Sequence, residues 1–268
     1  MKTITSITYP VFALFAFACF ALLPMAQALL PPPPPDGGYP GRNTAEGASA
    51  LLNNTTWTDN TANGFQALFG NMIGISNTGV GARALQHNGS GPNNTAVGAD
   101  ALNGNLFGAL NTAVGVKALF ANTGGIANTA VGGGALATLR GTFLQGATEN
   151  TAVGANALGD ATIGRQNTAV GRSALGSVTT GDGNIALGIA AGQGITVGNH
   201  NIDIGSSGFA SDSATIRIGQ QGLHTHTFVA GISGSPIAGT DASALQSLRG
   251  VSRMRSIPWT KQAKQSSR

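Results

Sequence analysis

A short motif returns along most of the chain at a fixed interval of 17 residues, and this repetition limits the fold more than any other feature of the sequence. The template runs from Asn43 to Leu51, and we number its asparagine as position 1 of the repeat. In most copies glycine follows at position 5, alanine at position 8 and leucine at position 9. The copies begin at Asn43, Asn60, Asn77, Asn94, Asn111, Asn128, Asn150 and Asn167, with looser copies at Asn184 and Asn201 and a fragment at Thr215.

The spacing of the repeat selects the fold class. The position-5 glycines keep the interval of 17 from Gly47 onward, except for 22 residues after Gly132 and 14 after Gly205. A unit of 17 is too short for the helix pairs of helical repeats, which need about 33 residues. The pentad Asn-Thr-Ala-Val-Gly favours a short strand, because Thr and Val suit a pleated surface. We therefore predict an all-β parallel β-solenoid (β-roll) over residues 43–219, with about eleven short coils stacked about 4.8 Å apart.

The looser copies predict which side chains point inward. Ile and Leu occupy positions 2 and 4 in these copies, whereas Asp203 and Arg217 occupy position 3. Because a charged residue alternates with apolar ones, positions 2 and 4 are expected inside the roll and position 3 outside. The asparagines at position 1 are expected to stack into an amide ladder, and the glycines at position 5 to lie at a corner with positive φ or at a close approach between coils.

The pentads at 94–98 and 184–188 resemble the head repeats of YadA-like trimeric autotransporter adhesins. This resemblance implies trimers of left-handed parallel β-rolls and a role in attachment to host or surface macromolecules. The few inward apolar side chains of each coil also favour a homotrimer that buries apolar faces between copies. Residues 220–268 show neither the heptads of the family's stalk nor the amphipathic strands of its membrane anchor.

A second resemblance concerns the end of the repeats. Residues 215–232 resemble the segment that precedes a C-terminal self-cleaving chaperone in phage-tail-like fibres. A truncated or frameshifted fibre that lacks this chaperone is therefore an alternative interpretation. A further alternative is an ice-binding or other ligand-binding solenoid. Ice-binding solenoids use outward Thr-x-Thr ranks, whereas each pentad here has one threonine, which isoleucine replaces at 185, 202 and 216. This replacement suggests that position 2 points inward and argues against ice binding.

The N-terminus has the features of a secretory signal. Lys2 is followed by an uninterrupted apolar run from Val11 to Leu23 and by the small-x-small sequence at 26–28. Thirteen apolar residues are too few to span a membrane, which needs about 20. Residues 1–28 are therefore expected to be a signal peptide, and the chain to be secreted, extracellular, at the cell surface or associated with an outer membrane. Residues 29–42 are expected to form a stiff proline-rich linker.

Charge is concentrated in the C-terminal tail. The formal net charge is +4, yet residues 249–268 carry six basic and no acidic side chains, and residues 29–248 carry seven basic and ten acidic ones. The repeat region is therefore not expected to bind nucleic acid. Residues 220–236 are expected to close the solenoid with terminal strands, and residues 237–268 to form a basic, disordered tail.

No group of residues predicts catalysis, and we expect neither an enzyme nor a cofactor or metal site. Only 9% of the residues are charged, and the acidic side chains are scattered along the chain without a glycosidase-like pair. Phosphate-loop motifs are absent from the sequence, and the calcium-like turn at 181–184 occurs once. His224 and His226 share one face of a strand but have no third ligand nearby. The single cysteine, Cys19, lies in the expected signal peptide, so a disulfide framework is not expected.

The one long repeat supplies a candidate contact site. Its five surplus residues fall within 137–148, where the register of the repeat is interrupted before it resumes at Asn150. Insertions in solenoids leave the stack as loops and often bind partners. We interpret Leu139, Arg140, Phe143 and Leu144 as a candidate contact loop. The alternative is that Phe143 and Leu144 fold back to cover the roll.

Overall fold

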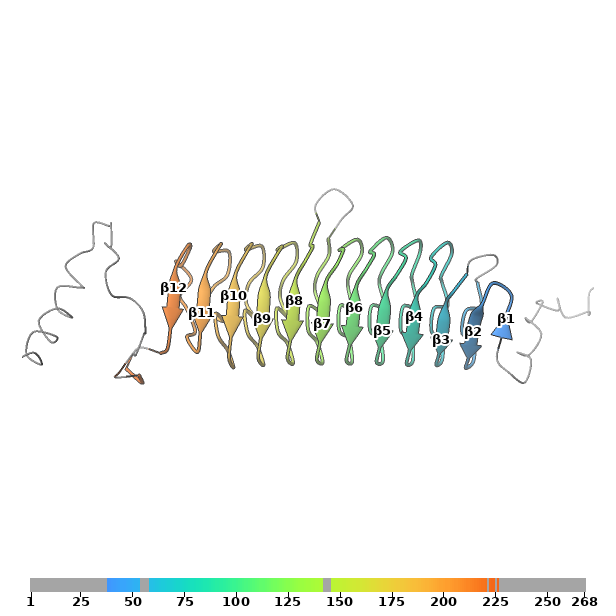
Figure 1. Cartoon of the computed structure of the whole chain (residues 1–268), viewed down its shortest axis with the longest axis horizontal. Coiled ribbons are helices and arrows are strands. Elements are labelled where there is room, and N and C mark those ends of the chain that lie inside the picture. The colour runs from blue at the N-terminus through green and yellow to red at the C-terminus, as the bar shows by residue number, and fades with distance from the viewer. Residues whose placement is uncertain (1–37, 54–57, 142–145, 221, 225, 227–268) are drawn as a thin grey trace, which may run out of the picture. The chain divides into compact units, whose positions relative to one another are not determined.

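A parallel β-solenoid forms the repeat region in the computed structural model of the chain (Figure 1). The structure describes residues 38–53, 58–141, 146–220, 222–224 and 226. One sheet holds twelve strands in chain order, and the eleven strands from β2 to β12 pair in parallel with their neighbours. The strands are β1 (Gly38–Tyr39), β2 (Asn43–Glu46), β3 (Thr61–Asn63), β4 (Thr78–Val80), β5 (Thr95–Val97), β6 (Thr112–Val114), β7 (Thr129–Val131), β8 (Thr151–Val153), β9 (Thr168–Val170), β10 (Ile185–Leu187), β11 (Ile202–Ile204) and β12 (Ile216–Ile218).

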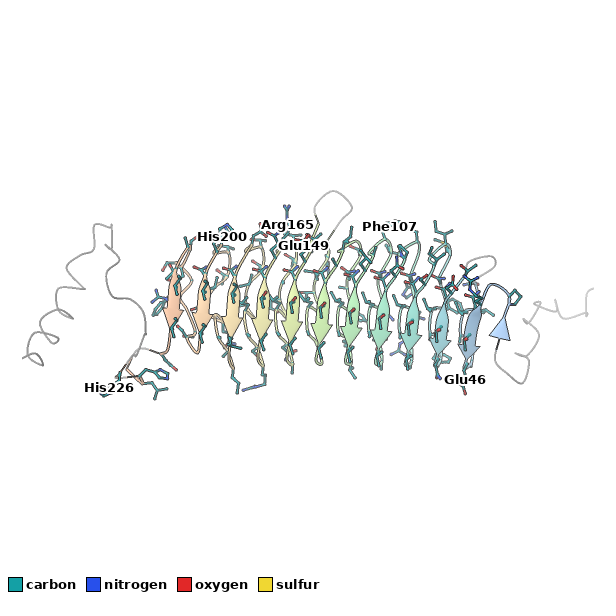
Figure 2. The ribbon with its side chains drawn as sticks, in the orientation of Figure 1. Glu46, Phe107, Glu149, Arg165, His200 and His226 are labelled. Atoms are coloured by element: carbon teal, nitrogen blue, oxygen red, sulfur yellow. The ribbon has the colours of Figure 1, made fainter. Side chains whose placement is uncertain are left out.

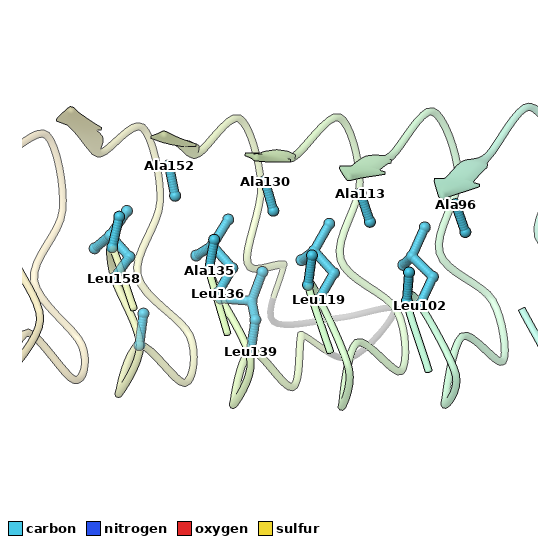
Figure 3. Packing of buried hydrophobic residues seen from close by; sticks show 14 of the residues in the cluster. Ala96, Leu102, Ala113, Leu119, Ala130, Ala135, Leu136, Leu139, Ala152 and Leu158 are labelled. Atoms are coloured by element: carbon cyan, nitrogen blue, oxygen red, sulfur yellow. The ribbon is translucent and has the colours of Figure 1, made fainter. Parts of the chain in front are cut away.

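Each coil contributes one short strand and returns through tight corners; the strand runs from position 2 to position 4, except that β2 begins at position 1. Many corner residues have a positive φ, and these include the leucines at position 9, with φ from 48° to 51°. The left-handed conformation is unfavourable for leucine. Burial offsets this cost, because the same leucines are among the largest side chains of the core. They pack there with the alanines at positions 3 and 8 (Figure 3).

The predicted orientation of the strand residues is wrong. The alanines at position 3 are buried, whereas positions 2 and 4 are largely half-buried or exposed. The buried asparagine at position 1 explains the reversal, since side chains two residues apart in a strand share a face. Asp203, whose charge suggested an outward position, is 1% exposed and lies inside the last coils. The apolar residues at positions 2 and 4 of the looser copies therefore lie on the outside, as Ile185 and Leu187 do in β10 and Ile216 and Ile218 do in β12.

The predicted asparagine ladder is confirmed. The Oδ1 atom of Asn111 accepts hydrogen bonds from the backbone N of Asn128 at 3.0 Å and from its Nδ2 at 3.2 Å. Other neighbouring pairs repeat this arrangement along the stack, and the Nδ2 also donates to a position-15 carbonyl, as Asn128 does to Ala147. The ladder satisfies buried amides and joins each coil to the next.

A second asparagine ladder, which the sequence analysis did not identify, runs through position 12. It links Asn71, Asn88, Asn105 and Asn122 by Nδ2 to Oδ1 hydrogen bonds of 2.6–2.8 Å. In the following coils Leu139, Ala161, Val178 and Ile195 take the same buried position. The core thus changes from a polar ladder to apolar packing at the sixth coil.

The two ends of the repeat region differ from the expected boundaries. Gly38–Tyr39, within the predicted linker, forms strand β1 and pairs antiparallel with β2. This pairing covers the first edge of the parallel sheet. At the other end, the described residues after Ile218 contain turns but no strand, so the predicted closing strands are not seen in that part of 220–236. Residues 1–37, which contain the expected signal peptide, and the whole of the expected tail at 237–268 lie outside the described residues.

Candidate functional site

Threonine and valine side chains form two parallel rows on the outer face of the sheet. From β4 to β9 every strand presents Thr at position 2 and Val at position 4, and the strands pair with Thr opposite Thr and Val opposite Val. The valines at 80, 97, 114, 131 and 153 are 37–38% exposed. We call this surface the threonine face, which consists of Thr78, Thr95, Thr112, Thr129, Thr151 and Thr168 with Val80, Val97, Val114, Val131, Val153 and Val170.

The threonine hydroxyls of this face have no hydrogen-bond partner among the described residues. Threonines elsewhere on the roll do bond to the protein, as Thr123 Oγ1 does to the carbonyl of Gly141 at 2.9 Å. The face carries no charged side chain, and Glu46 lies beyond it on β2. It is therefore a regular array of hydroxyl and methyl groups open to solvent.

A second surface lies along the edge built by positions 13–17 of the coils. Large apolar side chains gather there in the N-terminal half of the solenoid, with exposed fractions from 37% for Ile126 to 63% for Met72. Backbone hydrogen bonds between successive coils, such as Phe107 N to Thr123 O, stack these segments on one another. We call this surface the apolar edge, which consists of Met72, Ile73, Ile75, Leu106, Phe107, Leu110 and Ile126.

The same edge becomes polar toward the C-terminus. Figure 2 places Phe107, Glu149, Arg165 and His200 along one side of the solenoid and Glu46 on the other. Gln166 donates a 2.9 Å hydrogen bond to Glu149, and the backbone N of Arg165 donates to Asp182. The turn at 181–184 that resembled a calcium loop is thus one of the regular corners, and its aspartate already accepts a backbone hydrogen bond.

The predicted contact loop is only partly described. Leu139 is fully buried at position 12 of the core, so it does not belong to an exposed contact patch (Figure 3). Arg140 is exposed, as expected. Phe143 and Leu144 lie outside the described residues. Because Ala147 already accepts the hydrogen bond that position 15 accepts in other coils, the five surplus residues fall between Leu139 and Ala147.

Charged pairs in the described residues stabilise corners and do not form a catalytic cluster. Arg83 bonds Asp100 at 2.6 Å, Arg42 bonds Asp59, and Arg217 bonds Asp212. Hydrogen bonding to each arginine lowers the pKa of its aspartate. Each aspartate is therefore held ionised as an ion-pair partner, which does not suit a proton donor at neutral pH.

Asp203 differs from these aspartates. Its Oδ1 is buried without a hydrogen-bond partner, and desolvation raises the pKa of its carboxyl, with a further rise from the neighbouring charge of Asp212. Arg217 and Ser206 act in the opposite direction.

No group of three or more histidine, cysteine, aspartate or glutamate side chains in the described residues is placed to hold a metal ion. His224 and His226 were expected on one face of a strand, but neither residue lies in a strand, and the Nδ1 of His224 accepts a 2.9 Å hydrogen bond from the backbone N of Gln220. A shallow groove of about 410 Å³ lies over coils six to nine, with small and polar side chains that include Thr138, Asn156 and Asp160.

Within the described part of the chain, no helix has the length and apolar character needed to cross a membrane. Comparisons with family models, with curated proteins and with solved structures give no match to this chain. The surfaces of the solenoid are therefore the features that bear on its function.

Proposed function

We propose that the chain is a secreted or cell-surface structural protein, the head or shaft of a trimeric adhesin-like fibre that mediates attachment and has no catalytic activity. The stack of eleven parallel strands carries this proposal. Each coil contacts only its neighbours, so added coils lengthen the body without changing its cross-section. Such a body suits a spacer or a repetitive binding surface. The resemblance of the pentads to adhesin head repeats supports the same function.

The apolar edge supports assembly with further copies of the chain. Phe107 and Leu110 are 57% and 58% exposed, and Met72 is more exposed still. Exposed apolar clusters of this kind usually mark an interface. A second and a third copy would cover these side chains, and a parallel trimer would align three apolar edges along a common axis.

Attachment is tested with cells that produce the chain and isogenic cells that do not, each perfused over surfaces coated with extracellular-matrix protein. We expect greater retention of the producing cells, and loss of that retention when a protease that does not enter cells is added first. Equal retention of the two strains, together with protection of the chain from the external protease, would contradict both the adhesive function and the surface location.

A further inference from the structure

The threonine face is not explained by a role as a shaft, because a spacer has no need for six uncharged strands that present the same two outward residues on one side. We propose that this face binds ice. The ligand is crystalline water, held by the rows of threonine hydroxyls and by the methyl groups between them. This inference does not depend on the adhesive function or on the trimer.

The geometry of the face is regular in two directions. Neighbouring strands in a sheet lie about 4.7–4.9 Å apart, which is close to the repeat of oxygen atoms in hexagonal ice. The register from β4 to β9 places every threonine directly beside the next one. A water position that suits one hydroxyl therefore recurs at each of the six strands.

The face is also rigid. Threonine and valine are branched at Cβ, so they have few χ1 choices on a strand. Beneath them the position-3 residues, alanine in five of the six strands and glycine in β4, point into the closely packed interior. The asparagine ladder holds each coil at a fixed distance from the next through two hydrogen bonds to one Oδ1 atom, as between Asn111 and Asn128. Ordering of the side chains on binding therefore costs little entropy.

The chemistry of the face suits ordered water. The hydroxyls of Thr78, Thr95, Thr112, Thr129, Thr151 and Thr168 have no partner among the described residues, so each is available to donate and accept bonds with water. Threonine methyls and the partly exposed valines restrict the orientation of the water above them. Charged groups, which would organise water in a different pattern, are absent from all six strands.

The outward orientation removes the argument that position 2 points inward, and the second rank of the face is valine at position 4 in place of a second threonine. Position 2 was expected inside the roll, where threonine could not meet a crystal surface. The structure instead places it outside, and isoleucine replaces threonine only from β10 onward. The proposed ice-binding surface therefore consists of β4–β9 and does not extend to the C-terminal coils.

The test uses the purified, exported protein in measurements of thermal hysteresis and of incorporation into a growing ice hemisphere. The double variant Thr112→Lys, Thr129→Lys places two charged side chains at the centre of the face. Thr180→Lys makes the same chemical change at an exposed threonine outside the face and serves as the matched control. We expect the wild type and the control to lower the freezing temperature below the melting temperature and to be incorporated into the ice. We expect the double variant to lose both properties while it keeps its circular dichroism spectrum.

Two results would overturn the proposal. The first is a wild type that shows no gap between its freezing and melting temperatures and is not incorporated into the ice. The second is a double variant that falls from trimer to monomer by light scattering, because the threonine face would then be the seam between copies. If the double variant unfolds, we measure instead the variant Thr112→Ser, Thr129→Ser, which removes only methyl groups. Unchanged incorporation of that variant into ice would refute the role of the methyl array. A failure of cell attachment would contradict the proposed function and leave the ice measurements unaffected.

Discussion

Glycine at position 5 of the repeat is required by the closeness of adjacent coils. Gly115 has a φ of 135°, a region that side-chain-bearing residues rarely adopt. A Cβ atom built on Gly115 would lie 2.6 Å from the carbonyl carbon of Gly132 in the next coil. The sequence prediction for this position named both causes, a positive φ and a close approach, and both are confirmed.

Substitution of Gly115 by alanine should therefore destabilise the solenoid. The backbone conformation alone costs on the order of 1–3 kcal/mol, and the contact with the next coil adds to it. Gly133→Ala is the control, because its Cβ would meet only the carbonyl oxygen of Val116 at 3.8 Å. Chemical denaturation of both variants measures the difference. Equal stability of the two proteins would contradict this account of the corner.

Burial of Asp203 predicts an effect of pH on stability. Folding raises the pKa of this carboxyl, mainly through desolvation, so the folded state binds the proton more tightly than the unfolded state. The ionised carboxylate consequently destabilises the fold above its folded pKa, and this contribution disappears as the pH falls below the unfolded value of about 4.

The variant Asp203→Asn should melt at a higher temperature than the wild type at pH 7 and at the same temperature near pH 3. Thermal melts followed by circular dichroism across this range provide the measurement. Asp160→Asn replaces an exposed aspartate and should show no such pH-dependent difference. A variant at Asp203 that is less stable than the wild type at pH 7 would show that the charge contributes favourably to the fold.

The coil register could be predicted from the sequence, but the direction of the side chains could not be read from charge. Position 3 was assigned to the surface because Asp203 and Arg217 occupy it in the last coils. These two residues lie where the core ends, with Asp203 buried and Arg217 paired to Asp212, so they do not represent the central coils. The alanine or glycine at position 3 of the earlier copies, two residues after a recurring asparagine, was the more informative signal.

At the scale of the repeated element, stability depends on hydrogen bonds that cross from coil to coil. The position-1 ladder was predicted from the recurrence of asparagine. The position-12 ladder was missed, because asparagine occurs there only in the first five copies of the repeat and the apolar residues from Leu139 onward conceal the shared position. Both ladders bury polar groups that the small alanine and leucine core could not otherwise accommodate.

Replacement of Asn111 by alanine should be costly for this reason. The backbone N of Asn128 would lose its Oδ1 acceptor, and a buried group left without a partner costs about 1–3 kcal/mol, whereas the Nδ2 of Asn128 would keep its hydrogen bond to the carbonyl of Ala147. The control is Asn63→Ala, since that asparagine is exposed and, among the described residues, its side chain bonds only Glu46, at 3.0 Å. Its stability should change by less than about 0.5 kcal/mol. Comparable losses in urea denaturation of the two variants would refute a special role for the buried ladder.

At the scale of the whole molecule, the threonine face and the apolar edge differ in their side chains, and we propose a different role for each. The threonine face is regular and uncharged, whereas the apolar edge is irregular and rich in large side chains. Interfaces between proteins favour large, complementary apolar side chains. The apolar edge is therefore the better candidate for contact between copies, and in the proposed trimer the threonine face would be left open to solvent.

The double variant Phe107→Ser, Leu110→Ser should dissociate the proposed trimer. Both side chains are more than half exposed in the single chain, so their truncation removes little of the solenoid core but much of the apolar edge. The matched control is Val197→Ser, because Val197 occupies the same position of its coil as Phe107, is equally exposed at 57%, and lies on the polar half of the same edge.

Light scattering on the purified proteins should give about three times the monomer mass for the wild type and the control and one monomer mass for the double variant. This factor follows from the three-fold symmetry proposed above. Unchanged circular dichroism would show that each coil still folds within one chain, because the ladders and the leucine core are intramolecular. A wild type of monomer mass would contradict the trimer. A double variant that remains trimeric would show that the interface between copies does not depend on the apolar edge.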